Sequence, residues 1–132
     1  MKSVKFPHFN IRVIVLIVVI LILIGLYVYS MYSSNRISSE TAKQLINENY
    51  FDVILDVRTN LERETLGFYP NSVHIQSDNL EMELPKKFPD KNTKILAYCN
   101  TGHRARLAVD KLHKMGYEKS MYISSTYKTI LS

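Results

Sequence analysis

The sequence predicts an α/β domain with a mostly parallel central sheet, preceded by one transmembrane helix. Two observations carry this prediction. From about residue 38 onward, short apolar runs with the length of buried strands alternate with helical segments, which is typical of a parallel sheet. Before them, Val13 to Tyr29 forms an uncharged run of 17 residues, nearly all of them valine, isoleucine or leucine. A chain of 132 residues is long enough for one small domain and such an appendage.

The apolar run is long enough to span a bilayer as a helix. From Ile11 to Met31 there are 21 residues, which as a helix measure about 31 Å, close to the ~30 Å thickness of the hydrocarbon core. The run has no polar face, which argues against a helix packed in a soluble domain. We therefore divide the N-terminal part into a short basic tail (1–12), a transmembrane helix (13–31) and a linker (32–37).

A cleaved signal peptide is the alternative interpretation of this segment. Its apolar core would have about 7–15 residues and would be followed by small residues at the cleavage site. Here the core is longer, and Tyr27 and Tyr29 stand where small residues are needed, so the sequence favours an uncleaved anchor. Lys2, Lys5 and Arg12 precede the segment. The positive-inside rule then predicts a single-pass membrane protein with a cytoplasmic N-terminus and an extracytoplasmic domain.

The charge and cysteine content exclude several classes of function. The formal net charge is +5, but all 12 acidic and only 13 of the 17 basic residues follow residue 37. The folded part therefore carries +1, and the high pI gives no case for nucleic-acid binding. A single cysteine excludes an internal disulfide, and no cysteine or histidine pair has metal-ligand spacing. We expect the lipid bilayer as a partner, and we expect no metal, cofactor or nucleic acid. The sequence does not identify a protein partner.

The elements of the domain follow from short-range patterns in chain order. Ser38 or Ser39 is expected to cap the first helix, and Leu80, Leu84 and Phe88 share one face of the third. A turn at 89–92 precedes the strand before the only cysteine, and Gly116 ends the last helix. Helices are predicted at 40–49, 60–66, 80–88 and 105–115. Strands are predicted at 53–58, 73–75, 94–98 and 121–123.

Cys99, the only cysteine, occupies the position of a nucleophile. It lies between a predicted strand and a helix, at the start of a tight loop that runs to Arg104. Backbone N–H groups and the positive end of the helix dipole meet at such a point and stabilise a thiolate, and Arg104 and Arg106 add positive charge. The alternative is a small buried hydrophobic residue, because free cysteines are among the most buried residues.

Two further residues are expected beside Cys99. Asp56 and Arg58 end the first predicted strand, and ligands of open parallel sheets bind at the C-terminal ends of the strands. The three side chains are therefore expected at one edge of the sheet.

Four segments in this order resemble the rhodanese-like (sulfurtransferase) family. The segment Ile95 to Ala105, with its Cys-x-x-Gly-x-Arg loop, is the most specific. The others are the Asp-Val-Arg strand at 53–58, the segment 67–75 and the helix end at 111–117. The chain departs from the family at Phe68, where histidine is usual, and at Asn71, where glycine is common. Serines or threonine at 124–126 replace a glycine pair.

The resemblance implies a three-layer rhodanese-like domain over residues 38–132 and a sulfurtransferase activity. A small anionic sulfur donor, such as thiosulfate, passes a sulfane sulfur to Cys99, and the Cys99 persulfide passes it to cyanide or a thiol. Asp56 and Arg58 orient the active-site loop, and Glu62 or Glu64 pairs with Arg58. The loop N–H groups cradle the sulfur or the anion; the loop residues are Asn100, Thr101, Gly102, His103 and Arg104.

Two alternatives to this activity remain open at this point. One is a rhodanese-like module that binds a partner or carries sulfur with little turnover, which the replaced histidine and glycines favour. The other is a phosphatase or arsenate reductase, whose loops on this fold have five residues between cysteine and arginine. Here four residues separate Cys99 from Arg104, and Ala105 stands where the phosphatase arginine is needed. Phosphate would lose its bidentate partner, so loop length favours sulfur transfer.

Overall fold

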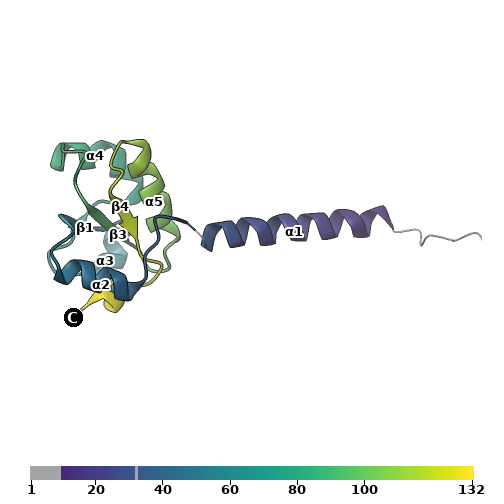
Figure 1. Ribbon diagram of the computed structural model, residues 1–132, viewed down its shortest axis with the longest axis horizontal. Helices are drawn as coiled ribbons and strands as arrows, with labels where there is room; N and C mark the ends of the chain where they lie inside the picture. The colour runs from purple at the N-terminus through teal and green to yellow at the C-terminus, as the bar shows by residue number, and fades with distance from the viewer. Residues whose placement is uncertain (1–9, 32) are drawn as a thin grey trace, which may run out of the picture. The chain divides into compact units, whose positions relative to one another are not determined.

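The computed structural model describes residues 10–31 and 33–132 (Figure 1). By its contacts the chain divides into two units, residues 1–33 and 34–132. Most of the predicted basic tail and Tyr32 lie outside the described residues.

The first unit contains one helix, α1 (Ile11–Met31), of 21 residues. Asn10 caps it, because its Oδ1 accepts a hydrogen bond from the Arg12 N–H at 3.1 Å. The span Ile11–Tyr29 has a mean hydropathy of 3.2, and none of it is buried. By length and composition this helix can cross a membrane, a test that a signal sequence near an N-terminus also passes.

The second unit is built on a four-stranded sheet in which every strand pair is parallel. The order is β2-β1-β3-β4, and the register pairs Asp56 with Tyr98 across β1 and β3. This confirms the predicted mostly parallel sheet. The strands are β1 (Val53–Asp56), β2 (Val73–His74), β3 (Ile95–Tyr98) and β4 (Ser120–Tyr122).

Part of the predicted linker also pairs with the sheet. The Tyr122 N–H donates to the Asn35 carbonyl, and the Ile37 N–H donates to the Tyr122 carbonyl. A parallel bridge joins Arg36 to Tyr122 between these bonds. Residues 35–37 therefore run beside the free edge of β4.

The four predicted helices are present, and their ends lie within two residues of the predicted ones. They are α2 (Ser39–Asn47), α3 (Asn60–Leu66), α4 (Leu80–Lys87) and α5 (His103–Lys114), with 3₁₀ turns η1 (Ser77–Asn79) and η2 (Tyr127–Ile130). Ser38 caps α2 by accepting from the Thr41 N–H. The last helix begins two residues earlier than expected, because Gly102 turns the chain at φ +92°.

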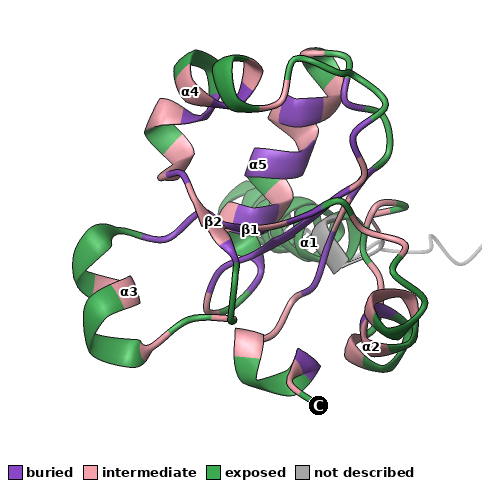
Figure 2. Cartoon of the chain, turned by 90° about the vertical axis from the view of Figure 1, so that its left-hand side faces the viewer, coloured by how far each residue is buried: buried purple, intermediate pink, exposed green. Residues whose placement is uncertain are grey.

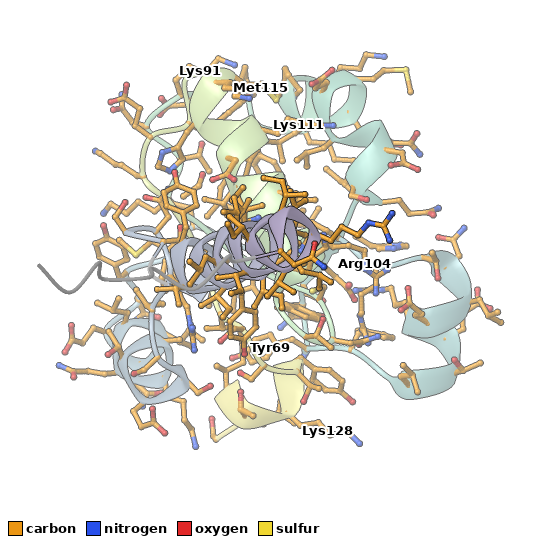
Figure 3. The ribbon with its side chains drawn as sticks, turned by 90° about the vertical axis from the view of Figure 1, so that its right-hand side faces the viewer. Tyr69, Lys91, Arg104, Lys111, Met115 and Lys128 are labelled. Carbon is orange, nitrogen blue, oxygen red and sulfur yellow. The ribbon has the colours of Figure 1, made fainter. Side chains whose placement is uncertain are left out.

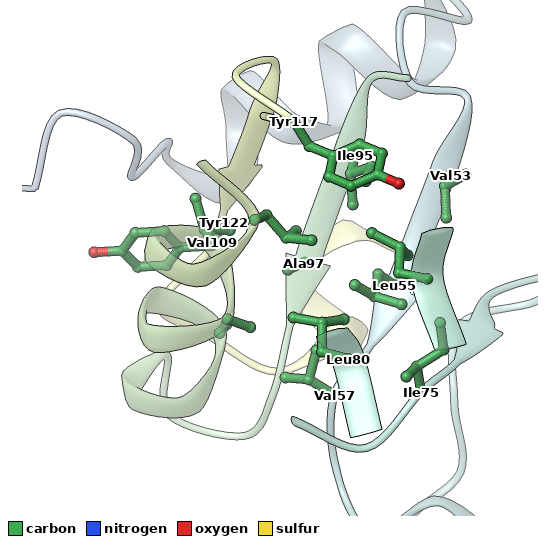
Figure 4. Packing of buried hydrophobic residues seen from close by; sticks show 14 of the residues in the cluster. Val53, Leu55, Val57, Ile75, Leu80, Ile95, Ala97, Val109, Tyr117 and Tyr122 are labelled. Carbon is green, nitrogen blue, oxygen red and sulfur yellow. The ribbon is translucent and has the colours of Figure 1, made fainter. Parts of the chain in front are cut away.

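Alternation along the strands divides the core into two layers, one on each face of the sheet. On one face, side chains of β1 and β3 pack against α4 and α5 (Figure 4). On the other, Leu96 and Tyr98 of β3 pack with α2 and η2. Most of β1 and all of β3 are buried, β2 is half-buried, and α3 is largely exposed (Figure 2). The result is the expected three-layer arrangement.

Leu112→Ala tests the larger layer. Leu112 on α5 is fully buried in that cluster, so the change should lower the free energy of unfolding by about 2–5 kcal/mol. Leu107→Ala on the same helix is the matched control: Leu107 is 47% exposed, so it should cost less than about 1 kcal/mol. Urea unfolding of the full-length protein in detergent, followed by the tyrosine signal in near-ultraviolet circular dichroism, measures both. An equal loss of unfolding free energy in the two variants would contradict the assignment of Leu112 to the core.

Candidate active site

Cys99 directly follows β3, on the face of the sheet that α5 covers. Alternation places it with Ile95 and Ala97 in the layer shared with α5. The residue is 1% exposed. The Gly102 N–H donates to its Sγ at 3.0 Å, so the loop folds back over the sulfur and presents a backbone donor to it. This is the environment at a helix N-terminus that stabilises an anionic sulfur.

Gly102 is required at the turn between the loop and α5. Its φ of +92° is in the left-handed region, and a Cβ on it would approach the Cα of Ser124 to 2.5 Å. Any larger residue would therefore strain the backbone and collide with the segment after β4. The backbone of Ser124 therefore lies directly against Gly102.

Asp56 is a buried carboxylate that accepts five hydrogen bonds at this edge of the sheet. Its Oδ1 accepts from the N–H and the Nε of Arg58 at 3.1 and 2.9 Å. Its Oδ2 accepts from Arg58 Nη2 at 2.7 Å, the Tyr98 hydroxyl at 2.9 Å and Arg63 Nη1 at 3.1 Å. Burial alone would raise the pKa of Asp56, but the hydrogen bonds from Arg58 and Tyr98 outweigh it and hold the pKa below its ordinary value.

Arg58 connects the hydrogen bonds around Asp56 to the loop that follows Cys99. Its Nη2 also donates to the Gly67 carbonyl at 2.7 Å, and its Nη1 donates to Asn100 Oδ1 at 3.3 Å. The structure thus places Arg58 against the Cys99 loop and Asp56 against Arg58. Their role in orienting the loop stays a prediction.

Glu62 pairs with Arg104, and the expected partnership of Glu62 or Glu64 with Arg58 is wrong. Both carboxylate oxygens of Glu62 accept from the guanidinium of Arg104, at 2.6 and 2.7 Å, and Oε1 also accepts from Asn100 Nδ2 at 2.9 Å. Arg58 instead pairs with Asp56, the last residue of β1, at 2.7 Å. Glu64 is exposed. Arg104 thus extends from α5 toward α3 (Figure 3).

Glu62 is held in this position by the helix it belongs to. It forms a capping box with Thr59, whose N–H and hydroxyl both donate to Oε2, at 3.0 and 2.9 Å. The hydrogen bonds from Arg104 chiefly, with smaller contributions from Thr59, overcome desolvation and lower the pKa of Glu62 from 4.5 to about 2. The Thr-x-x-Glu spacing at residues 59–62 is the sequence signal that could have distinguished Glu62 from Glu64.

The remaining predicted loop residues face outward. Thr101 and His103 are exposed. Arg106 lies in the first turn of α5; its Nε is buried without a hydrogen-bond partner in the described part of the chain. Of the side chains in the loop, Asn100 and Arg104 therefore make the contacts to other elements.

The departures from the family pattern have local physical reasons. Phe68 lies under the guanidinium of Arg63, 3.8 Å from its ring centre, a cation–π contact. Asn71 adopts a left-handed φ of 61°, which asparagine tolerates better than most residues.

Among residues 10–31 and 33–132, no group of three or more histidine, cysteine or carboxylate side chains is placed to hold a metal ion.

Comparison with known sequences finds one family model. The model, described as Rhodanese-like domain, matches residues 38–126. A tRNA sulfurtransferase of Blochmanniella pennsylvanica (strain BPEN) is 34% identical over 88 residues. That match covers 56% of this chain and 18% of the relative, so the chain spans less than a fifth of its length.

Solved structures share the fold. A protein of unknown function from Rhodopseudomonas palustris CGA009, described as a possible tyrosine phosphatase, is 20% identical with a TM-score of 0.67; the match covers 98% of this chain and 94% of that chain. A human single-domain sulfurtransferase is 19% identical with a TM-score of 0.58, over 74% of this chain and 95% of that chain. At these identities the likeness is one of fold.

Acid titration tests the Glu62 ion pair. Because the pKa of Glu62 is lowered from 4.5 to about 2 in the folded state, its contribution to stability is complete above about pH 4.5 and is lost as the pH falls toward 2. Glu62→Gln should therefore be less stable than wild type at pH 6, and the difference should shrink between pH 4.5 and 2. Unfolding at a series of pH values measures this. Glu64→Gln is the matched control and should follow the wild type; a Glu62→Gln difference that does not change with pH would contradict the ion pair.

Proposed function

Because the chain belongs to the rhodanese-like domain family, we propose that it is a membrane-anchored sulfurtransferase that moves a sulfane sulfur through a Cys99 persulfide. The observation that carries this proposal is the Gly102 N–H donated to Cys99 Sγ at 3.0 Å, at the N-terminus of a 12-residue helix. Such a site stabilises a thiolate and then an anionic persulfide at the same sulfur. Sulfane sulfur transfer needs one such cysteine and no second thiol.

The reaction divides into two transfers at Cys99. With a thiosulfate-type donor, the thiolate attacks the outer sulfur, the S–S bond breaks, and sulfite leaves with the bonding electron pair. Cys99 then carries an outer sulfur with a negative charge, which the loop N–H groups stabilise. Attack of cyanide or a thiolate on that outer sulfur forms thiocyanate or a new persulfide and returns the Cys99 thiolate.

The second candidate is a module that carries sulfur, or binds a partner, with little turnover. The observation that favours it is the 1% exposure of Cys99, which limits direct access to the sulfur. Phosphoryl transfer is less well supported, because Ala105 is fully buried in the core and Arg104 is occupied by Glu62. An arginine facing a bound phosphate would have to come from elsewhere.

The anchor proposal rests on α1, whose apolar span matches the thickness of a bilayer. We propose a single pass with a cytoplasmic N-terminus and the catalytic domain outside. The sulfur donor and acceptor would then be molecules of the extracytoplasmic compartment. Export through a cleaved signal peptide is the alternative.

Cys99→Ser tests the persulfide mechanism. Incubation of the wild-type protein with thiosulfate should add one sulfur atom, seen by intact mass spectrometry, and thiosulfate:cyanide turnover should be measurable. The variant is nearly isosteric and should fold, yet both signals should fall by at least about a hundredfold. Wild-type protein alkylated with iodoacetamide is the matched control. Persulfide formation with negligible turnover would favour the carrier module, and hydrolysis of an aryl phosphate through Cys99 without sulfur uptake would replace the proposal with a phosphatase.

Membrane fractionation tests the anchor. Since about 14 apolar residues at roughly −0.3 to −0.6 kcal/mol each favour insertion by ~6 kcal/mol, the full-length protein should stay with membranes through high-salt and alkaline washes. Replacing Leu21 and Ile22 with arginine should release it. A shortened, soluble form of the unaltered protein would instead establish signal-peptide cleavage.

A further inference from the structure

We propose that Glu62 is a positioning residue that sets the class of sulfur donor. By holding Arg104, it withdraws that guanidinium from the donor site, so that the site takes sulfur from thiol-borne donors, organic persulfides, in preference to the dianion thiosulfate. This inference rests on the proposed sulfur transfer at Cys99.

The first step is that Arg104 is already occupied. The sequence places this arginine in the loop that is expected to cradle the sulfur or the anion. In the structure both of its terminal nitrogens donate to the two oxygens of Glu62, at 2.6 and 2.7 Å. Such bidentate arginine–carboxylate pairs are the strongest of the side-chain ion pairs. An anionic donor would have to displace a carboxylate to reach the guanidinium.

The second step is that Glu62 cannot readily move away. Its two oxygens accept five hydrogen bonds: two from Arg104, one from Asn100, and two from Thr59 at the cap of α3. Turning toward solvent would break the capping box and the contact to Asn100 together. The carboxylate is therefore a fixed charge of the site, supplied by α3 to the loop.

The third step concerns the other arginines around the loop. Arg58, which donates to Asn100, is buried against Asp56. Arg63 donates to the same Asp56 and to Ser72. Of the described residues, each arginine whose side chain hydrogen-bonds to a loop side chain already faces a carboxylate. Arg106, in the first turn of α5, has a buried Nε without a hydrogen-bond partner in the described part of the chain. The attraction left for an anion therefore comes from Arg106, the backbone N–H groups and the helix dipole, without the guanidinium of Arg104.

The two donor classes differ in the charge that this site must accept. Thiosulfate brings two negative charges to the Cys99 thiolate and releases sulfite with two. An organic persulfide brings at most one negative charge on its sulfurs, and none in its protonated form, R–S–SH. In that form the Cys99 thiolate attacks the outer sulfur, the S–S bond breaks, and R–S⁻ leaves with the bonding pair. The proton stays on the transferred sulfur, and no oxidant or reductant is consumed. A site whose arginine is neutralised favours the second reaction.

Alkylation of Cys99 measures the local charge independently of turnover. Iodoacetate is an anion and iodoacetamide is neutral, and both alkylate the same thiolate. In Glu62→Gln, Arg104 is no longer neutralised, so the ratio of the iodoacetate rate to the iodoacetamide rate should rise about fivefold over wild type. This corresponds to one unit charge acting at a few ångströms in a largely aqueous environment.

Kinetics with two donors tests the specificity itself. In Glu62→Gln, kcat/KM for thiosulfate should rise about fivefold through a lower KM. The kcat/KM for the persulfide of 2-mercaptoethanol, which has no other charged group, should rise less. Replacing Arg104 as well, in Glu62→Gln/Arg104→Gln, should remove both the thiosulfate gain and the alkylation gain. Because Arg106 is unchanged in the double variant, loss of both gains there would assign them to Arg104 and not to Arg106.

Two control variants distinguish an effect of the Glu62 charge from an effect on the structure of the loop. Glu64→Gln removes one carboxylate from the exposed side of the same helix and should leave both ratios at the wild-type value. Glu62→Asp keeps the charge while shortening the side chain, and should also keep the wild-type ratios even if it weakens the cap. Thermal unfolding of the full-length proteins in detergent verifies that each variant is folded.

Several outcomes would overturn the inference. It is wrong if Glu62→Gln lowers sulfur transfer from both donors equally with no change in the alkylation ratio, since Glu62 would then act only in the stability of the loop. It is also wrong if the higher kcat/KM for thiosulfate, or the higher alkylation ratio, persists in Glu62→Gln/Arg104→Gln. If no donor loads Cys99 in the wild type, the proposed function fails, and the alkylation ratio still reports whether Glu62 withdraws Arg104.

Discussion

The buried pair of Asp56 and Arg58 is the interaction on which the site depends. Both side chains are almost inaccessible to solvent, and removing two charges from water is costly unless their hydrogen-bonding groups are satisfied. Here the cost is offset because Asp56 accepts from five donors, including the Tyr98 hydroxyl. Arg58 uses its remaining donors on Gly67 and Asn100. One buried carboxylate thereby ties together β1, β3, the segment after α3 and the loop of Cys99.

The second ion pair, of Glu62 with Arg104, has a different character. Its side chains are 26% and 34% exposed, so solvent and salt weaken it and its contribution to folding is modest. Its influence on the site is electrostatic: it decides whether the loop offers a guanidinium or a neutral pair to an incoming donor. The buried pair thus supports the loop's shape, and the more exposed pair sets the loop's charge. Asn100 joins the two pairs, because its Oδ1 accepts from Arg58 and its Nδ2 donates to Glu62.

The geometry around Cys99 follows from strand alternation. Because successive residues of a strand face opposite sides, Tyr98 turns to the α2 face, where it meets Asp56, and Cys99 turns to the α5 face, where it meets Gly102 N–H. A shift of one residue would exchange these environments and place the sulfur against the carboxylate. The nucleophile and its supporting network therefore depend on the same register of β1 and β3.

The sequence by itself determined the fold class, the order of the elements, the apolar helix, and the position of Cys99 between a strand and a helix. These follow from composition and short-range periodicity, as with the Val13–Tyr29 run, and from local motifs such as the Cys-x-x-Gly-x-Arg loop. Only the tertiary structure decided which charges pair. Glu62 and Arg104 lie 42 residues apart in the chain, and several carboxylates and guanidiniums at the same sheet edge satisfy the sequence pattern equally well. Their pairing is selected by the distances between α3, β1 and α5, which no local pattern encodes.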